Sequence, residues 1–163
     1  MKKPQTNYAF IDGQNLYLSV KEIGWTLDTR KFRVYLSEKY GVATAYYFIG
    51  YISGNTALYN ALESYGYVMK YKSTFYLKDG KPKGNCDPEL VLQAMVDFNK
   101  YEKAVIVTSD GDFACLVEYL RKQNKLQCVL APSKGGCSHL LKKAAQGNIS
   151  YMDELRRKLE YRK

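Results

Sequence analysis

Apolar and polar residues follow one another along this chain in an order that predicts strands leading directly into helices. The run Val105–Thr108 is apolar and β-branched, as in a strand buried on both faces. The polar turn Ser109–Asp112 interrupts it, and from Phe113 the apolar residues take the spacing of a helix. Such a turn places its carboxylates, here Asp110 and Asp112, at the carboxyl edge of a parallel sheet, where ligands bind in open α/β folds.

The beginning of the chain repeats this layout. Asn7–Ile11 reads as a buried strand, Asp12 and Gly13 follow it, and a helix begins near Leu16. Asp12 is therefore a second carboxylate at the carboxyl end of a strand. In both places a plain turn or helix cap is an equal alternative, because Asp, Asn and Gly are common in turns and caps.

The remaining segments continue the alternation of strands and helices. Further strands are expected at 42–52, 67–72, 127–131 and 149–152, the last as an edge strand. Further helices are expected at 29–40, between Asp28 as N-cap and Gly41, and at 55–65, 88–98, 140–146 and 153–163. Asp87 fits the N-cap of the 88–98 helix, and Ser138 fits that of the 140–146 helix. This order predicts a three-layer α/β/α fold with a mainly parallel central sheet, in which 105–108 is an interior strand beside 8–11.

The composition narrows the class of protein. The chain has 163 residues, of which 46% are hydrophobic and 25% charged; we expect one soluble domain over residues 1–163, with the basic helix at about 153–163 packed on it or trailing from it. We see no export signal and no apolar run that could span a bilayer, and we expect no membrane and no small organic cofactor. The four cysteines lack metal-binding spacing, which favours a reduced, cytoplasmic protein. Whether the protein forms homo-oligomers is left open.

The charge of the chain indicates a polyanionic partner. The net charge is +9 and the pI is near 9.3, although a basic surface also keeps proteins soluble. One region mixes lysines with aromatic residues: Lys70, Tyr71, Lys72, Phe75, Tyr76, Lys78, Lys81 and Lys83. Lysines bind phosphates and aromatic rings stack on bases, so this region could hold an RNA strand. The alternative is a solvated hairpin around Asp79-Gly80, whose lysines protect an exposed edge.

Acidic residues are scarce but cluster at particular turns, at Asp12, Asp87, Asp110 and Asp112. Carboxylates that converge in a basic protein repel one another unless a cation joins them, and Mg²⁺ or Mn²⁺ would satisfy such a group. One or two such ions could activate a water to attack a phosphodiester. His139 is the only histidine, so the metal would have to replace a histidine base. A basic protein with a small acidic centre has the features that a nuclease needs.

Three segments resemble the signatures of NYN domains, specifically the LabA-like branch of these relatives of PIN-domain nucleases: Phe10–Asn15, Lys83–Asp87 and Ser109–Phe113. Ser138–Ala145 is similar to the late serine-and-leucine helix of that family, and the resemblance extends from about Tyr8 to Leu155. It implies a PIN-like, Rossmann-like fold and a metal-dependent ribonuclease that uses Mg²⁺ or Mn²⁺.

The resemblance also implies roles for individual residues. The metal ligands and catalytic acids would be Asp12, Asp87, Asp110 and Asp112, and Asn15 would orient a phosphate or a water. Ser109 would add a hydrogen bond to the substrate. Ser138, in the late helix, is a further candidate for substrate binding, together with Lys81 and Lys83 of the lysine-rich region.

Two departures from the family pattern leave a second function open. Many relatives carry an acid inside the helix after Asp87, where this chain offers the neutral Gln93 or the displaced Asp97, and the late helix reaches Gln146 where relatives often have Asp. A non-catalytic RNA-binding or regulatory module on a nuclease-like scaffold is therefore the alternative. A Mg²⁺-dependent phosphatase is a third class, which the basic surface disfavours.

Overall fold

A computed structural model describes residues 5–73, 75–76, 78–80, 82–83 and 86–163. Its central feature is a six-stranded sheet in the order β3-β2-β1-β6-β7-β8, in which every neighbouring pair is parallel. The strands are β1 (Asn7–Asp12), β2 (Val42–Tyr51), β3 (Tyr67–Ser73), β6 (Ala104–Val107), β7 (Leu126–Ala131) and β8 (Ile149–Tyr151). The expected parallel α/β architecture is confirmed.

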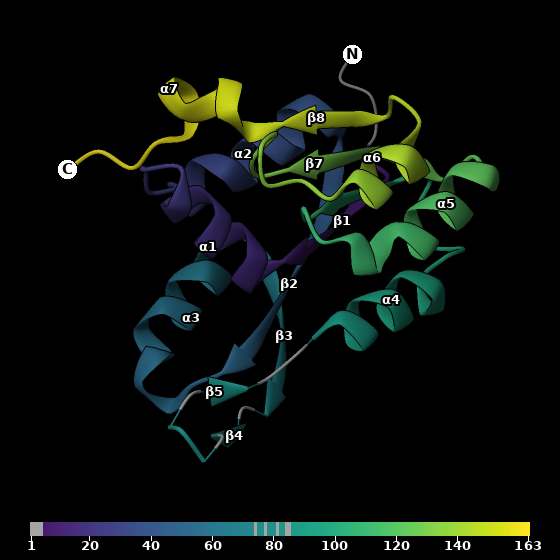
Figure 1. The fold of residues 1–163 in the computed structure, drawn as a ribbon. Helices are drawn as coiled ribbons and strands as arrows, with labels where there is room; N and C mark the ends of the chain where they lie inside the picture. Colours follow the sequence, from purple (N-terminus) through teal and green to yellow (C-terminus); the bar gives the residue numbers. More distant parts are fainter. Residues whose placement is uncertain (1–4, 74, 77, 81, 84–85) are drawn as a thin grey trace.

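Helices cover both faces of this sheet (Figure 1). The α-helices are α1 (Gly13–Glu22), α2 (Thr29–Tyr40), α3 (Thr56–Ser64), α4 (Asp87–Val96), α5 (Ala114–Lys122), α6 (His139–Ala145) and α7 (Arg156–Leu159). Three 3-10 turns accompany them: η1 (Ser53–Asn55), η2 (Gly111–Phe113) and η3 (Met152–Leu155). A short antiparallel hairpin, β4 (Phe75–Tyr76) and β5 (Pro82–Lys83), lies beyond the end of β3, in agreement with the hairpin that Asp79-Gly80 suggested.

Two separate hydrophobic cores result from this layering. The first lies between the sheet and helices α1, α2 and α3, and the second between the sheet and α4, α5 and α6. Residues of β1 alternate between them, with Ala9 and Ile11 in the first core and Phe10 in the second. Because successive side chains of a strand point to opposite faces, this alternation follows directly from the sequence of β1.

The two strands with acidic turns lie side by side at the centre of the sheet. Tyr8 pairs with Ala104 and Ile11 with Val107, and all four residues of β6 are buried. The expected interior position of both strands is confirmed. Because neighbouring parallel strands end at the same edge of the sheet, Asp12 and Asp110 meet there.

Several helix boundaries match the sequence signals. Asp28 caps α2 by accepting a hydrogen bond from the backbone N–H of Lys31 at 3.0 Å, and Gly41 ends this helix with a positive φ of 64°. Ser138 caps α6, and its Oγ accepts a hydrogen bond from Leu140 N–H. In each case the residue satisfies backbone groups that a helix end leaves open.

Two boundaries differ from expectation. The N-cap of α4 is Cys86, so Asp87 is the first residue of the helix and the expected cap at Asp87 is wrong. The C-terminal helix α7 ends at Leu159, and Glu160 forms a β-bridge with Leu27. Backbone hydrogen bonds to the 26–28 segment compete with helical ones at this point, so the expected helix to residue 163 is wrong in its length.

None of the helices in the described part of the chain combines the length and the apolar character needed to cross a membrane.

Candidate metal centre

A cleft of about 740 Å³ opens at the carboxyl ends of β1 and β6. Its lining comes from α1, α4, the β6–α5 turn and the segment before α6. The lining residues are Asp12, Gln14, Asn15, Leu18, Ser19, Glu22, Asp87, Ser109, Asp110, Gly111, Asp112, Gly136 and Ser138. Five of these are acidic and none is basic, although the whole chain carries a net charge of +9.

Three carboxylates converge in this cleft. One oxygen each from Asp12, Asp87 and Asp110 lies within 4.8 Å of the others, and all three residues are half-buried. They come from the end of β1, the start of α4 and the turn after β6. The fold therefore brings together acids that are far apart in the sequence.

Asp12 is held by the start of α1. Its Oδ1 accepts a 3.4 Å hydrogen bond from Asn15 N–H, and its Oδ2 accepts a 3.1 Å hydrogen bond from the Thr108 hydroxyl. Burial raises the pKa of Asp12 and the neighbouring Asp110 charge adds to this, while the two hydrogen bonds act in the opposite direction. The site thus disfavours the ionised form of Asp12, as expected for one acid among several.

Asp110 is fixed by its own turn. Its Oδ1 accepts a 2.9 Å hydrogen bond from Asp112 N–H, which makes Asp110 the N-cap of η2. Its backbone N–H donates to the Thr108 hydroxyl at 3.2 Å. Since the same hydroxyl donates to Asp12, Thr108 links the two acidic turns.

Asp87 reaches the cleft from the first position of α4, one residue inside the helix. The positive end of the helix dipole favours a carboxylate at this position. The N-cap position itself belongs to Cys86, whose side chain makes no cap bond.

Asp112 lines the same cleft but lies outside the group of three. It is exposed, and its backbone N–H donates a hydrogen bond to Asp110. Residues two apart in a helical turn point in different directions, which explains why Asp110 and Asp112 do not converge. Asp112 serves the cluster here through its backbone.

Asn15 and Ser109 form a second layer beside the acids. The Asn15 Oδ1 accepts two hydrogen bonds of 2.9 Å, from the backbone N–H and from the hydroxyl of Ser109. The Ser19 hydroxyl lies 3.5 Å from the Ser109 hydroxyl. These contacts fix the plane of the Asn15 amide and direct its NH₂ group away from Ser109.

Ser138 supports the cleft from the far side. Its backbone N–H donates to the Ser109 carbonyl at 3.0 Å. A Cβ on Gly111 would lie 2.4 Å from the Ser138 hydroxyl oxygen, and a Cβ on Gly13 would lie 2.4 Å from the Tyr47 ring. Close packing therefore favours glycine directly after Asp12 and directly after Asp110.

The structure describes only part of the lysine-rich region that was expected to contact RNA. Lys81 lies outside the described residues, and for Lys83 the backbone is described as part of β5 but the side chain is not. Nearby, Lys72 forms a 3.3 Å ion pair with Glu89 in the first turn of α4, and Lys70 lies over the Tyr46 ring. The lysine-rich strand thus reaches the end of α4 that carries Asp87.

Gln93 and Gln146, the two neutral residues at which this chain departs from the family pattern, make contacts outside the cleft. Gln93 donates a 3.0 Å hydrogen bond to Asp97, which also accepts one of 2.5 Å from the Tyr46 hydroxyl. Asp97 is buried and pairs with Lys100. Gln146 is exposed and ends α6 in a left-handed conformation. Neither glutamine lines the cleft.

Sequence reasoning missed Thr108 and one face of α1. Thr108 is fully buried at the end of the apolar run. A hydroxyl at the end of a buried strand was the sequence signal that could have pointed to its contact with the acids. Leu18, Ser19 and Glu22 line the cleft together with Asn15, and their spacing of three and four residues marks one helical face.

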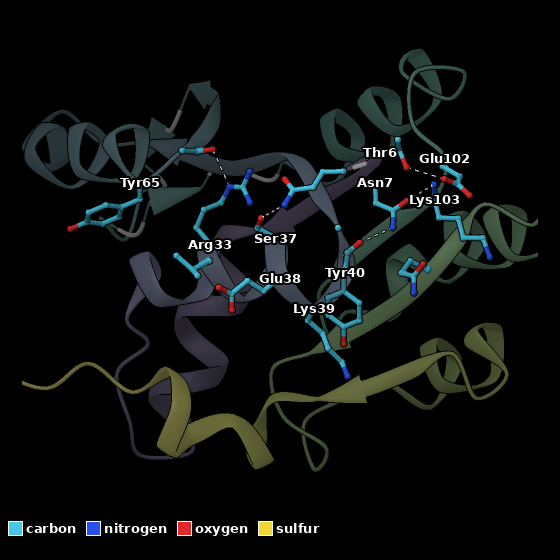
Figure 2. Close-up of a pocket in the computed structure, with 15 residues that line it drawn as sticks. Thr6, Asn7, Arg33, Ser37, Glu38, Lys39, Tyr40, Tyr65, Glu102 and Lys103 are labelled. Carbon is cyan, nitrogen blue, oxygen red and sulfur yellow. Dashed lines mark hydrogen bonds between the residues drawn. The ribbon is translucent and has the colours of Figure 1, made fainter. Parts of the chain in front are cut away.

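A larger hollow of about 940 Å³ lies at the amino ends of the strands (Figure 2). It carries both signs of charge, including Arg33, Glu38, Glu102 and Lys103. Arg33, labelled in Figure 2, is held by the backbone: its guanidinium donates to the carbonyls of Gly66, Val42 and Ala43. Other polar groups of the hollow are also hydrogen-bonded: Gln5 donates to the Ser37 hydroxyl, Thr6 to Glu102 and Asn7 to the Tyr40 carbonyl.

Comparison with known proteins identifies the family of this chain. A curated relative, the low amplitude and bright protein LabA of Synechococcus elongatus, is 27% identical over 138 residues, which are 78% of this chain and 74% of LabA. The crystal structure of a Vibrio parahaemolyticus protein of unknown function matches with a TM-score of 0.79 and 20% identity, over 99% of this chain and all of that one. The family model of the NYN domain matches residues 8–153. The chain therefore belongs to the NYN domain family, and its scaffold is nuclease-like.

Proposed function

We propose that this protein is a ribonuclease that cleaves RNA phosphodiester bonds with the help of Mg²⁺ or Mn²⁺ held in the acidic cleft. The observation that carries the proposal is the convergence of Asp12, Asp87 and Asp110, whose oxygens lie within 4.8 Å of one another. Membership of the NYN family supports a nucleic acid as the substrate.

The donor set fits a hard divalent cation. Carboxylate oxygens bind Mg²⁺ at about 2.0–2.1 Å, and two ligands of one ion lie up to about 4 Å apart, so the three acids need only a small adjustment to share one. The raised pKa of Asp12 reflects burial and repulsion by Asp110, and a cation between them would relieve the repulsion. We assign Asp12, Asp87 and Asp110 as ligands, and Asp112 as an outer acid that contacts the ion or its waters.

A bound divalent cation would supply Lewis acidity and lower the pKa of a water near the scissile phosphate. The chain supplies positioning. Thr108 keeps Asp12 and Asp110 in place, and the Asn15 NH₂ group can donate to a phosphate oxygen because Ser109 fixes its amide. His139 is exposed at the start of α6 and does not line the cleft, so we assign a carboxylate of the cleft as the acceptor of the water's proton.

Basic residues outside the cleft complete the proposal. The cleft itself repels phosphate when no cation is present, because its charged lining residues are all acidic. The surplus of positive charge elsewhere attracts the RNA backbone. We assign Lys81 and Lys83 to phosphate contacts, and Ser109 and Ser138 to the substrate side of the cleft.

The test is cleavage of an end-labelled RNA by the purified protein with Mn²⁺, with Mg²⁺ and in excess EDTA. Cleavage should require the cation and should fall by at least about a hundredfold in Asp110→Asn, which keeps the side chain's shape but removes a charge from the ligand set. Glu38→Gln is the matched control, because Glu38 is an exposed acid that lines the hollow at the opposite edge of the sheet. Cleavage that persists in EDTA, or an Asp110→Asn variant as fast as the parent, would contradict the proposal.

One observation favours a second candidate, an RNA-binding module without catalysis. The two residues of α4 and its end that are nearest to the acid of many relatives, the neutral Gln93 and the displaced Asp97, bond to each other and do not line the cleft. Fewer acids bind a cation more weakly. This candidate predicts RNA binding that is unaffected by EDTA and no cleavage with any divalent ion.

A further inference from the structure

Three tyrosine rings form a cluster at the carboxyl ends of β2 and β3. The ring centroids of Tyr51 and Tyr59 are 5.5 Å apart, those of Tyr51 and Tyr71 are 5.5 Å apart, and those of Tyr59 and Tyr71 are 5.1 Å apart. Tyr51 is 44% exposed and Tyr71 is 41% exposed, whereas Tyr59 is only 3% exposed. The cluster therefore consists of two open rings on a buried third ring.

The buried ring is firmly anchored. The Tyr59 hydroxyl donates to the Gly50 carbonyl at 3.3 Å and accepts from Ile52 N–H at 2.9 Å. These bonds connect α3 to the end of β2 and fix the ring on which Tyr51 and Tyr71 pack. Two aromatic rings held in this way lose little conformational freedom when a ligand contacts them.

The cluster lies at the same edge of the sheet as the acidic cleft. Asp12 pairs with Phe48 on the neighbouring strand, and Tyr51 comes three residues later on that strand. With about 3.3 Å per residue and about 4.8 Å between strands, the Cα atoms of Asp12 and Tyr51 are roughly 11 Å apart. About three stacked nucleotides, at roughly 3.4 Å each, would cover this distance.

The chemistry of this surface suits a nucleic-acid base. Tyrosine rings stack on any base, because every base has an aromatic face. Burial raises the pKa of Tyr71, and the nearby Glu63, Tyr59 and Tyr51 add to this, so its phenol remains neutral at physiological pH. Lys70 and Lys72 flank Tyr71 along β3 but point to the other face of the strand, where Lys72 pairs with Glu89 and Lys70 lies over the Tyr46 ring.

We propose that Tyr51 and Tyr71 form a stacking platform for an unpaired base of an RNA strand whose backbone enters the acidic cleft. The path into the cleft rests on the proposed function; the platform itself does not. A base in a duplex is already stacked and paired, so the platform selects RNA that is single-stranded next to the cleft. The alternative is that the three rings only cover the end of the sheet.

The test is fluorescence anisotropy with a labelled 12-nucleotide oligouridylate and a 12-base-pair RNA duplex, both in EDTA so that no cleavage occurs. We expect Tyr51→Leu and Tyr71→Leu each to weaken binding of the single strand about tenfold, and to leave duplex binding unchanged. The dependence of binding on salt should not change, because neither substitution removes a phosphate contact.

Two control variants separate stacking from packing. Tyr71→Phe keeps the aromatic ring and should bind the single strand like the parent. This expectation can be tested even if Tyr71→Leu does not fold. Tyr65→Leu removes a tyrosine that is 36% exposed and lies at the opposite edge of the sheet, where Figure 2 shows it, and it should also bind like the parent.

Failure of the platform can be distinguished from failure of the proposed function. Single-strand binding that is unchanged in Tyr51→Leu and Tyr71→Leu, equally weakened in Tyr65→Leu, or absent in the parent would overturn the platform, whether or not the protein cleaves RNA. A tenfold loss confined to the two leucine variants would support it, including in a protein that never cleaves.

Discussion

The two edges of the central sheet differ in how their charges are satisfied. At the amino edge, the larger hollow contains both signs of charge, and several of its polar groups are hydrogen-bonded, as Arg33 is to three backbone carbonyls. At the carboxyl edge, the smaller cleft is lined by acids without a basic residue among its described lining. Unbalanced charge, and not the size of a hollow, is therefore the reason why the proposed metal site lies at the carboxyl edge.

The largest effect is expected from a substitution in the acidic cleft at the carboxyl edge. Asp12→Asn should lower metal-dependent cleavage by about a thousandfold, because it removes a ligand charge while keeping the cap of α1. In EDTA the same variant should unfold at a slightly higher temperature than the parent, because burial and Asp110 disfavour the ionised Asp12. Cleavage assays and thermal unfolding measure the two effects.

Asn15→Ala provides the graded comparison for Asp12→Asn. It removes hydrogen bonds to Ser109 and no charge, so cleavage should fall less. Thermal unfolding in EDTA provides the contradicting outcome. If Asp12→Asn lowered the unfolding temperature by more than Asn15→Ala does, repulsion among the acids would not destabilise the cleft.

The second prediction breaks the amino edge. Arg33→Met removes the donor to three carbonyls and should lower the free energy of unfolding by about 2–3 kcal/mol, while cleavage per folded molecule stays unchanged. Denaturant unfolding measures the loss, and Arg33→Lys, which keeps the charge but not the planar fork, should lie between. A variant that kept its stability but lost cleavage would show that the amino edge belongs to the active site.

The smallest effect is expected at Asp97, an acid outside the cleft whose carboxylate is fully hydrogen-bonded by its neighbours. Burial would raise the pKa of Asp97, but hydrogen bonds from Tyr46, Gln93 and Lys100 hold it below its ordinary value. The ionised Asp97 therefore contributes stability at neutral pH, and this contribution is lost as the pH falls through its folded pKa.

Asp97→Asn should accordingly lower the free energy of unfolding by about 1–2 kcal/mol at pH 7, with a difference from the parent that shrinks below about pH 4. Denaturant unfolding across this pH range measures it. A difference that grew on acidification would mean that the charge of Asp97 destabilises the fold.

Patterns in the sequence predicted most of the fold. The apolar runs around Ile11 and Ile106 became the central strands, because only buried positions accept such residues on both faces. Asp28 and Gly41 marked the ends of α2 because capping depends on local backbone groups. The C-terminal helix was predicted too long, since backbone pairing between Glu160 and Leu27 is not visible in local propensity.

The site was predicted in kind but not in membership. The acids after two central strands had to meet, because parallel strands end at one edge. The distance of Asp112 from the other acids depends on the direction of a single 3-10 turn, and the link through Thr108 depends on two strands lying side by side. No spacing in the sequence contains that information.

The sequence by itself determined the layers, the order of elements and the edge at which the acids gather, because periodicity and capping are properties of neighbouring residues. Only the tertiary structure shows which three carboxylates converge, that both glutamines lie outside the cleft and which tyrosines form a cluster. Those outcomes depend on contacts between Asp12, Asp87 and Asp110, or between Tyr51 and Tyr71, and only the folded sheet brings these residues together.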